Sequence, residues 1–258
     1  MPAFQEDIDS YFSIYLCYPI SKAKLGQVVP VSCERRLQPE IGWGYTVAIW
    51  VHITRGKAII SVKPSLFKNL DALFIKQPEP RQLYTLNWRK KIGSLIGSND
   101  TGQLVHVLYC RPEKCRLFQI PECRRLLESD IEAYVKMKLD LYPSCEPDCL
   151  VRDIQRNILD GIAFGVFQKG KLVCVSEAPS IGHMQNLVEE VGVDILPEYQ
   201  GWGYGKAVIS AMTKAILHIG RIPLYRCNSR NEASMRLAKE VGYENHSDII
   251  QFREPDKS

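Results

Sequence analysis

The 258-residue sequence lacks the long runs that would direct a protein to a membrane or to nucleic acid. Nowhere do apolar residues continue for the ~18 positions that a membrane-spanning helix needs. No basic run of five or more occurs, and a net charge of only +4, from 33 basic and 29 acidic residues, gives no footprint for nucleic acid. The first residues, MPAFQEDIDSYF, are acidic and have no apolar signal core. We therefore expect a cytoplasmic protein without membrane or nucleic-acid partners.

Cysteine motifs for metal binding are also missing. The chain has 9 cysteines, an odd number, and no Cys-x-x-Cys pair occurs. The group Cys110, Cys115 and Cys123 has looser spacings than a zinc site, and its nearest histidine is His106. We therefore expect reduced thiols, buried as small apolar residues, and no bound metal.

The composition is that of an ordinary globular protein, with 45% hydrophobic and 24% charged residues, and the length allows two domains. The most informative stretch is residues 191–220. It opens with a β-branched, alternating run that predicts a strand, which Pro197 ends because proline cannot donate to a ladder. Residues 200–206, QGWGYGK, then precede an amphipathic helix that Gly220 closes.

A strand, a glycine-rich turn and a helix N-terminus together form an anion cradle. Free N–H groups and the positive end of the helix dipole point at the turn, and glycine lets a ligand approach the backbone. We therefore expect a phosphate or pyrophosphate ligand. Spacing excludes a Walker loop, because Gln200 and Ala207 stand where glycine and Ser or Thr are needed. A dinucleotide fingerprint also fails, because its third glycine is shifted to Gly205.

The remaining pattern divides the chain near residue 116. The first part contains strand-like runs and one weak helix, so we expect an α+β N-terminal domain over residues 1–115. Residues 116–258 predict the order β-α-α-β-β-β-α-β-α-β, which is a mixed sheet, and Ser129 to Glu132 form a capping box for its first helix. The expected strands and helices of the N-terminal part are 45–52, 57–62, 64–74 and 105–109, with a hairpin between the first two.

The pattern at 200–205, QGWGYG, after its strand, closely resembles the acyl-CoA signature of the GNAT N-acetyltransferase superfamily. Residues 123–130 are similar to the first strand and helix start of that fold, and 231–243 to its last helix and the Gly-aromatic pair after it. The resemblance covers residues 117–258 and is closest to two-domain members with a C-terminal acetyltransferase half. It implies an α+β protein whose mixed, splayed central sheet is flanked by helices and preceded by a smaller α+β domain.

The resemblance also implies acetyl-CoA as the cofactor and CoA as a product. The strand before the glycines would pair with the pantetheine arm, and the N–H groups of the turn would hold the pyrophosphate. The residues that the resemblance assigns to the cofactor are Val193, Asp194, Ile195, Gln200, Gly201, Trp202, Gly203, Tyr204, Gly205, Lys206 and Asn231.

Direct acetyl transfer needs a base for the amine and an acid for the thiolate leaving group. The strand glutamate that some members use as base corresponds to Glu189, eleven positions before Gln200, and its neighbour Glu190 faces the other way. The sequence departs from the family at Ala238, where many members carry a tyrosine that serves as the acid for the thiolate. Either water or one of three side chains replaces it, namely Tyr225, Cys227 or Tyr243, or the thiolate leaves without an acid. His183 and His246 are expected in loops beside the mouth of the site.

The main expectation is an enzyme that acetylates a primary amine of a small molecule or a protein; a homodimer is left open. Three alternatives remain at this stage. They are a catalytically silent acyl-CoA sensor, a nucleotide-binding regulatory module, and an acetyltransferase-like partner domain that acts through the N-terminal half. Acceptor specificity is expected in the N-terminal domain and in the loops around residues 140–150 and 178–186.

Overall fold

The computed structural model describes residues 4–40, 45–75, 77–159, 161–178 and 187–254. The chain forms two compact units. The first unit comprises Met1–Val107, Cys227–Arg230 and Asn245–Ser258, and the second comprises Leu108–Arg226 and Asn231–Glu244. The domain boundary between residues 115 and 116 stays a prediction; the compact units divide the chain at Val107, and its last strand returns to the first unit.

Strand β2 (Val47–Thr54) is the centre of the sheet in the first unit. It pairs antiparallel with β3 (Lys57–Val62) on one side and with β11 (Glu244–Arg253) on the other, while β3 pairs in parallel with β1 (Val28–Ser32). The predicted hairpin between β2 and β3 is confirmed. Its turn is Arg55-Gly56, with φ of 42° and 70°, the geometry that matches the twist of the two strands.

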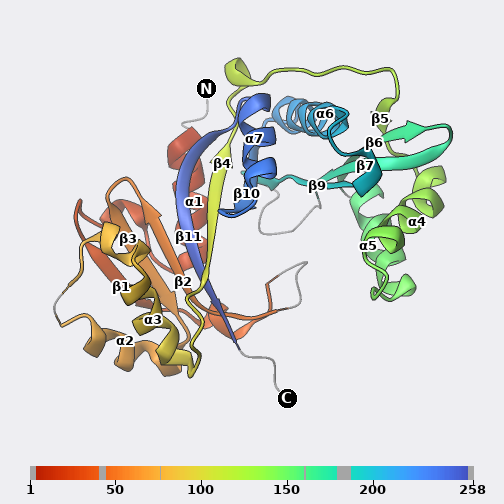
Figure 1. The fold of residues 1–258 in the computed structure, drawn as a ribbon. Coiled ribbons are helices and arrows are strands. Elements are labelled where there is room, and N and C mark those ends of the chain that lie inside the picture. The colour runs from red at the N-terminus through yellow and green to blue at the C-terminus, as the bar shows by residue number, and fades with distance from the viewer. Residues whose placement is uncertain (1–3, 41–44, 76, 160, 179–186, 255–258) are drawn as a thin grey trace. The chain divides into compact units, whose positions relative to one another are not determined.

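Helices cover both faces of β2, all of whose residues are buried (Figure 1). Trp50 and His52 face α1 (Phe4–Leu16), where the ring centroids of His52 and Phe12 lie 4.6 Å apart. The alternate residues, such as Val51, pack in the apolar core with α2 (Phe67–Leu73) and α3 (Leu86–Gly93). The sequence predicted α2 and the strand β4 (Gln103–Tyr109), but it missed α1, α3 and β1.

A four-stranded antiparallel sheet organises the second unit. Its strands, in spatial order, are β5 (Cys123–Arg125), β6 (Ile162–Gln168), β7 (Lys171–Ala178) and β9 (Gly192–Ile195). The predicted two-residue hairpin at Lys169-Gly170 joins β6 to β7, with φ of 50° and 81°.

The two faces of this sheet carry different helices (Figure 1). Asp194 of β9 reaches Lys138 of α4 (Ile131–Leu141), which packs beside α5 (Pro147–Leu159). The next residue, Ile195, lies against Gly205 of α6 (Tyr204–His218). Because successive strand residues point to opposite faces, α4 and α5 cover one face and α6 the other.

A second, shorter pairing completes this unit. Strand β8 (Val188–Glu190) pairs in parallel with β10 (Ile222–Asn228), so the strand predicted around Val191 is two strands with different partners. Helix α7 (Glu232–Val241) follows β10. Its predicted cap is confirmed, since the Asn231 side chain accepts from the Ser234 N–H at 3.0 Å.

Two local predictions were wrong. The capping box at Ser129 and Glu132 does not form, because the chain makes a 3₁₀ turn over Glu128–Asp130 and the Asp130 carboxylate accepts from the Leu127 N–H at 2.8 Å. His246 is not in a loop; it lies buried within β11 in the first unit, 3.3 Å from the Asp9 carboxylate. His183 lies outside the described residues. None of the helices in the described ranges combines the length and apolar character that crossing a bilayer would require.

His52 makes the first unit sensitive to acid. Its side chain is fully buried and, within the described residues, neither ring nitrogen has a hydrogen-bond partner. Burial, helped by the nearby His246, lowers the pKa of His52 to about 3. The unfolded chain therefore takes up a proton first, near its ordinary pKa of ~6.5.

We predict that stability falls as the pH drops from about 6.5 toward 3, by up to about 1.4 kcal/mol per pH unit from this residue. His52→Phe should remove this contribution, because phenylalanine does not titrate and fills a similar space. Urea denaturation at pH 7.5 and at pH 5 would measure it, with the exposed His218→Gln as control. Equal loss of stability on acidification in wild type and His52→Phe would contradict the prediction.

Candidate functional site

The site begins at Val191, where the chain changes partners. The Val191 N–H donates to the Leu224 carbonyl of β10 at 2.8 Å. From Gly192 onward the chain pairs instead with β7, in a register that sets Val193 opposite Ser176. Strand β9 is therefore an edge strand of its sheet in the described structure, and one row of its backbone groups points away from β7. An extended ligand with amide groups could pair with that row as a further strand would.

The predicted glycine cradle follows directly after this strand. Gly201 and Gly203 have φ of 82° and 85°, in the left-handed region, and a Cβ on either would meet no atom within 4 Å. Gly203 is the N-cap of α6 and has no side chain that could cap the helix, so the N–H groups of the first turn can bind a ligand. An open, positive helix end of this kind fits a pyrophosphate.

Gly205 brings three elements together at the cradle. A Cβ at this position would lie 2.9 Å from Ile195 Cδ1 and 3.2 Å from Leu237 Cδ2. Only a residue without a side chain lets β9, α6 and α7 approach so closely. The cradle is thus held against both the edge strand and the last helix of this unit.

All but one of the predicted cofactor residues lie in one segment, residues 193–206. Val193, Asp194 and Ile195 are the last three residues of β9, and residues 200–206 form the turn and the start of α6. The Trp202 side chain is 69% exposed. The Lys206 ammonium lies 3.0 Å from Glu240 of α7, so this residue offers the cradle its N–H group. Asn231 lies outside this segment, as the N-cap of α7, the helix whose Leu237 lies against Gly205.

A partly buried ionic network that the sequence did not predict lies on the α4 face of β9. The Lys138 ammonium donates to Glu177 at 3.0 Å and also pairs with Asp194. Asn157 donates to the same glutamate at 2.7 Å, and the Tyr142 hydroxyl to the Asp194 carboxylate at 2.8 Å. Burial alone would lower the pKa of Lys138, but the two carboxylates outweigh it and hold that pKa above its usual range. The network ties β7 and β9 to both helices.

The two glutamates of β8 point to opposite faces, as strand geometry requires. Glu189 is 2% exposed; one carboxylate oxygen pairs with Arg221, and the other is buried without a hydrogen-bond partner among the described residues. Burial raises the pKa of Glu189, and Arg221 opposes that rise in part. Glu190 accepts a hydrogen bond from Arg226 at 2.6 Å.

Ala238, which stands at the usual position of the proton donor, is fully buried in α7 and has no proton to donate. The three candidates that could replace a donor there differ in their surroundings. The Tyr243 hydroxyl is also buried and lies 2.7 Å from that of Thr213, a bond within the core. The Tyr225 hydroxyl lies 2.8 Å from that of Ser234, in the first turn of α7. Cys227 is buried within β10.

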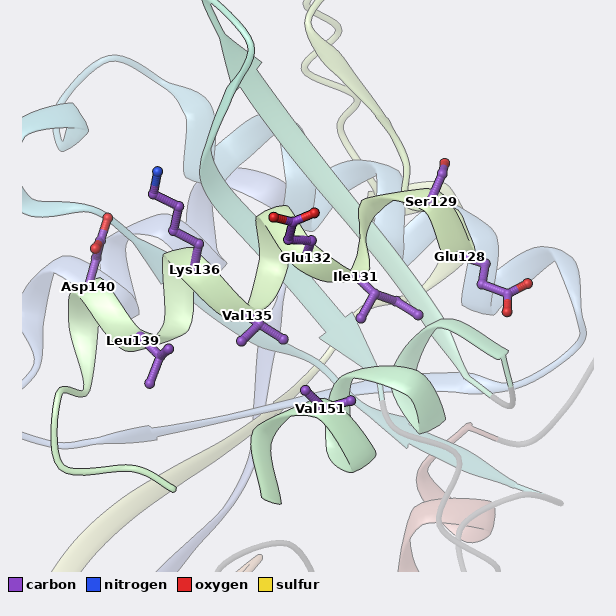
Figure 2. A pocket seen from close by; sticks show the side chains of 9 residues that line it. All are labelled: Glu128, Ser129, Ile131, Glu132, Val135, Lys136, Leu139, Asp140 and Val151. Atoms are coloured by element: carbon purple, nitrogen blue, oxygen red, sulfur yellow. The ribbon is translucent and has the colours of Figure 1, made fainter. Parts of the chain in front are cut away.

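A separate groove of about 720 Å³ opens between α4 and α5. Figure 2 shows Ile131, Val135 and Leu139 of α4 pointing toward Val151 of α5, with polar side chains such as Glu132 turned outward. None of the residues that line it belongs to β9 or to the glycine turn, so the groove is not part of the cradle.

The open edge of β9 thus leads directly into the glycine turn, an arrangement that suits an extended ligand with a pyrophosphate. The family model of the GNAT acetyltransferases matches residues 88–251, which is more than half of the chain. The chain therefore belongs to the GNAT acetyltransferase family, whose members transfer acetyl groups from acetyl-CoA. No curated protein matches the sequence.

Several solved structures of acetyltransferases are similar to this chain. The chain is 17% identical to a GNAT acetyltransferase from Colwellia psychrerythraea, with a TM-score of 0.51 over 59% of this chain and 56% of that one. The chain is 21% identical to a putative GNAT acetyltransferase from Novosphingobium aromaticivorans, with a TM-score of 0.45 over 58% of this chain and 63% of that one. It is 16% identical to a putative acetyltransferase from Salmonella typhimurium that was solved with acetyl-CoA, with a TM-score of 0.40 over 53% of this chain and 95% of that one. The chain thus spans little more than half of the first two proteins.

We predict that Lys138→Met destabilises the protein by about 2 kcal/mol, because two partly buried carboxylates lose their shared cation. Chemical denaturation of the variant would measure this. The matched control is Lys171→Met, since that ammonium also bridges two carboxylates but is 41% exposed. It should change stability little. If both variants unfold at the same denaturant concentration, the Lys138 network contributes no more to the free energy of unfolding than the exposed Lys171 pairs do.

Proposed function

We propose that this protein is an N-acetyltransferase that moves the acetyl group of acetyl-CoA directly to a primary amine of a small molecule or a protein. The observation that carries the proposal is the change of partner at Val191. It leaves the outer edge of β9 open beside a helix N-terminus that is built for a pyrophosphate. A pantetheine arm and a pyrophosphate are joined in CoA, and the edge and the cradle are joined in this chain.

The residues of the chain would share the work as follows. The backbone of Val193–Ile195 holds the pantetheine amides, and the N–H groups from Gly201 to Lys206 hold the pyrophosphate, with Gln200 at the start of the turn. When bound, acetyl-CoA supplies an activated thioester whose carbonyl carbon an amine can attack. Such transfer needs a base that removes a proton from the amine.

Glu189 is the preferred base. Its unpartnered carboxylate oxygen can accept a proton, and the raised pKa makes this carboxylate a stronger base than an exposed glutamate. Arg221 holds the other oxygen and fixes the orientation of the group. Glu190, the other candidate, is engaged with Arg226 on the opposite face.

Binding and chemistry can be tested separately. Thermal shift should show stabilisation by acetyl-CoA and by CoA, and none by ATP, since binding to the native state alone raises the melting temperature. A thiol-release assay with spermidine, a lysine peptide, glucosamine and an aminoglycoside should then identify an accepted amine. If neither acetyl-CoA nor CoA raises the melting temperature, the proposal is wrong. Binding without thiol release for any amine would favour a silent acyl-CoA sensor.

We predict that Glu189→Gln lowers kcat by about a hundredfold while its melting temperature at pH 7 is equal to or above that of the wild type. The native state raises the pKa of Glu189, so its ionised form costs stability as the pH rises, and the neutral glutamine removes that cost. Glu190→Gln is the matched control and should retain activity. A Glu189→Gln variant with unchanged kcat on an accepted amine would exclude this base.

A further inference from the structure

Two cysteine thiols meet at the end of α1 in the first unit. Cys17 directly follows this helix, and Cys33 lies between β1 and a 3₁₀ turn, η2 (Glu34–Leu37). The two thiols are hydrogen-bonded to each other, although β1 separates them in the chain. Cys33 is buried, whereas Cys17 is exposed, so a small reagent in solution can reach one sulfur of the pair.

The backbone of Cys17 has a conformation that favours glycine. Its φ is 57°, in the left-handed region, and its N–H donates to the Ile14 carbonyl at 3.3 Å. The Tyr18 N–H donates to the Ser13 carbonyl at 3.0 Å, which completes the Schellman motif that ends many helices. A residue with a side chain costs free energy in this conformation, and such outliers gather at functional positions. The fold therefore holds a thiol where helix geometry alone would select glycine.

The surroundings of the pair favour a thiolate. The Arg35 N–H donates to both sulfurs, and the Arg36 guanidinium is fully buried, 4.4 Å from the centre of the Tyr15 ring. The Arg36 Nε has no hydrogen-bond partner among the described residues. Burial alone would raise the pKa of Cys33, but the Cys17 thiol, the Arg35 N–H and the Arg36 charge outweigh it and hold that pKa below its usual range. Nearby cations and N–H donors of this kind are typical of reactive cysteines.

A second pair of thiols in the chain provides a comparison. Cys110 and Cys115 of the second unit are also hydrogen-bonded to each other. Cys110 is buried, however, and Cys115 is only half-exposed, so neither sulfur of this pair is as open to solvent as that of Cys17. The pair at the end of α1 thus combines close contact, cationic surroundings and an exposed sulfur.

We propose that Cys17 and Cys33 are a modification site at which hydrogen peroxide produces a disulfide. The Cys17 sulfur attacks one peroxide oxygen, the O–O bond breaks, and a water leaves as Cys17 becomes a sulfenic acid. The Cys33 sulfur then attacks the Cys17 sulfur, the S–O bond breaks, and a second water leaves with the proton of Cys33. Two thiols together lose two electrons, and one peroxide is reduced to two waters.

The disulfide would fasten α1 to the rest of the first unit. It closes a loop that contains η1 (Ile20–Lys22) and β1, and it joins the end of the helix to the start of η2. A cross-link over such a loop restricts the unfolded chain and stabilises the folded one. Oxidation should therefore leave a more stable protein.

The test needs neither CoA nor an acceptor, because the site does not rest on the proposed function. The full chain would be treated with a small excess of hydrogen peroxide, digested, and mapped by mass spectrometry. The wild type should give a linked peptide pair that contains Cys17 and Cys33. Its melting temperature should rise by about 5 °C, and dithiothreitol should reverse the rise. Cys17→Ser should show neither change. Cys115→Ser is the matched control and should behave as the wild type does.

Three results would overturn the proposal. The first is a treated wild type in which Cys17 is recovered only as a thiol or a sulfinic acid. The second is a linked wild type whose melting temperature does not rise. The third is a rise that persists in Cys17→Ser or disappears in Cys115→Ser, which would assign it to the other pair. If Cys17→Ser does not fold, Cys17→Gly takes its place, because glycine adopts the left-handed conformation without strain.

Discussion

The hydrogen bond from Val191 to Leu224 is the constraint on which the site depends. A strand has two edges, and each backbone group can satisfy only one neighbour at a time. Before this bond the chain pairs with β10, and after it the chain pairs with β7. The two halves of what is almost one strand therefore belong to different pairings. The edge that this change exposes would be a hazard in most sheets, but here it continues directly into a helix N-terminus.

Buried charge on each side of the strand reflects this arrangement. On the α4 face, Lys138 holds Asp194 and Glu177, so the open edge strand is fastened to the body of the unit by side chains. At β8, Glu189 is buried with one oxygen unpartnered among the described residues, which a structural ion pair would avoid. The first arrangement stabilises the strand, whereas the second lowers stability and raises basicity. Such a cost is typical of a functional site.

Sequence reasoning succeeded where short-range chemistry determines the structure. The two hairpins, the glycine turn, α6 and the Asn231 cap all follow from residues a few positions apart, and the structure has each of them. It failed where the partner is distant. His246 belongs to β11, whose residues 248–253 pair with β2 about two hundred residues earlier in the chain, and β1 pairs with β3 about thirty residues later. The Lys138 network joins residues from α4, β7 and β9, and no local pattern marks them.

The same distinction explains why the cofactor site and the proton-transfer residues differ in how well they can be predicted. Backbone N–H and C=O groups hold the cofactor in the proposed mode, so the sequence needs glycines at the points of close approach and little else. Proton transfer needs one atom at one place, and that atom can come from any element that reaches it. The alanine at position 238 of α7 therefore has no effect on the cradle, and no local pattern in the sequence marks which side chain supplies the proton.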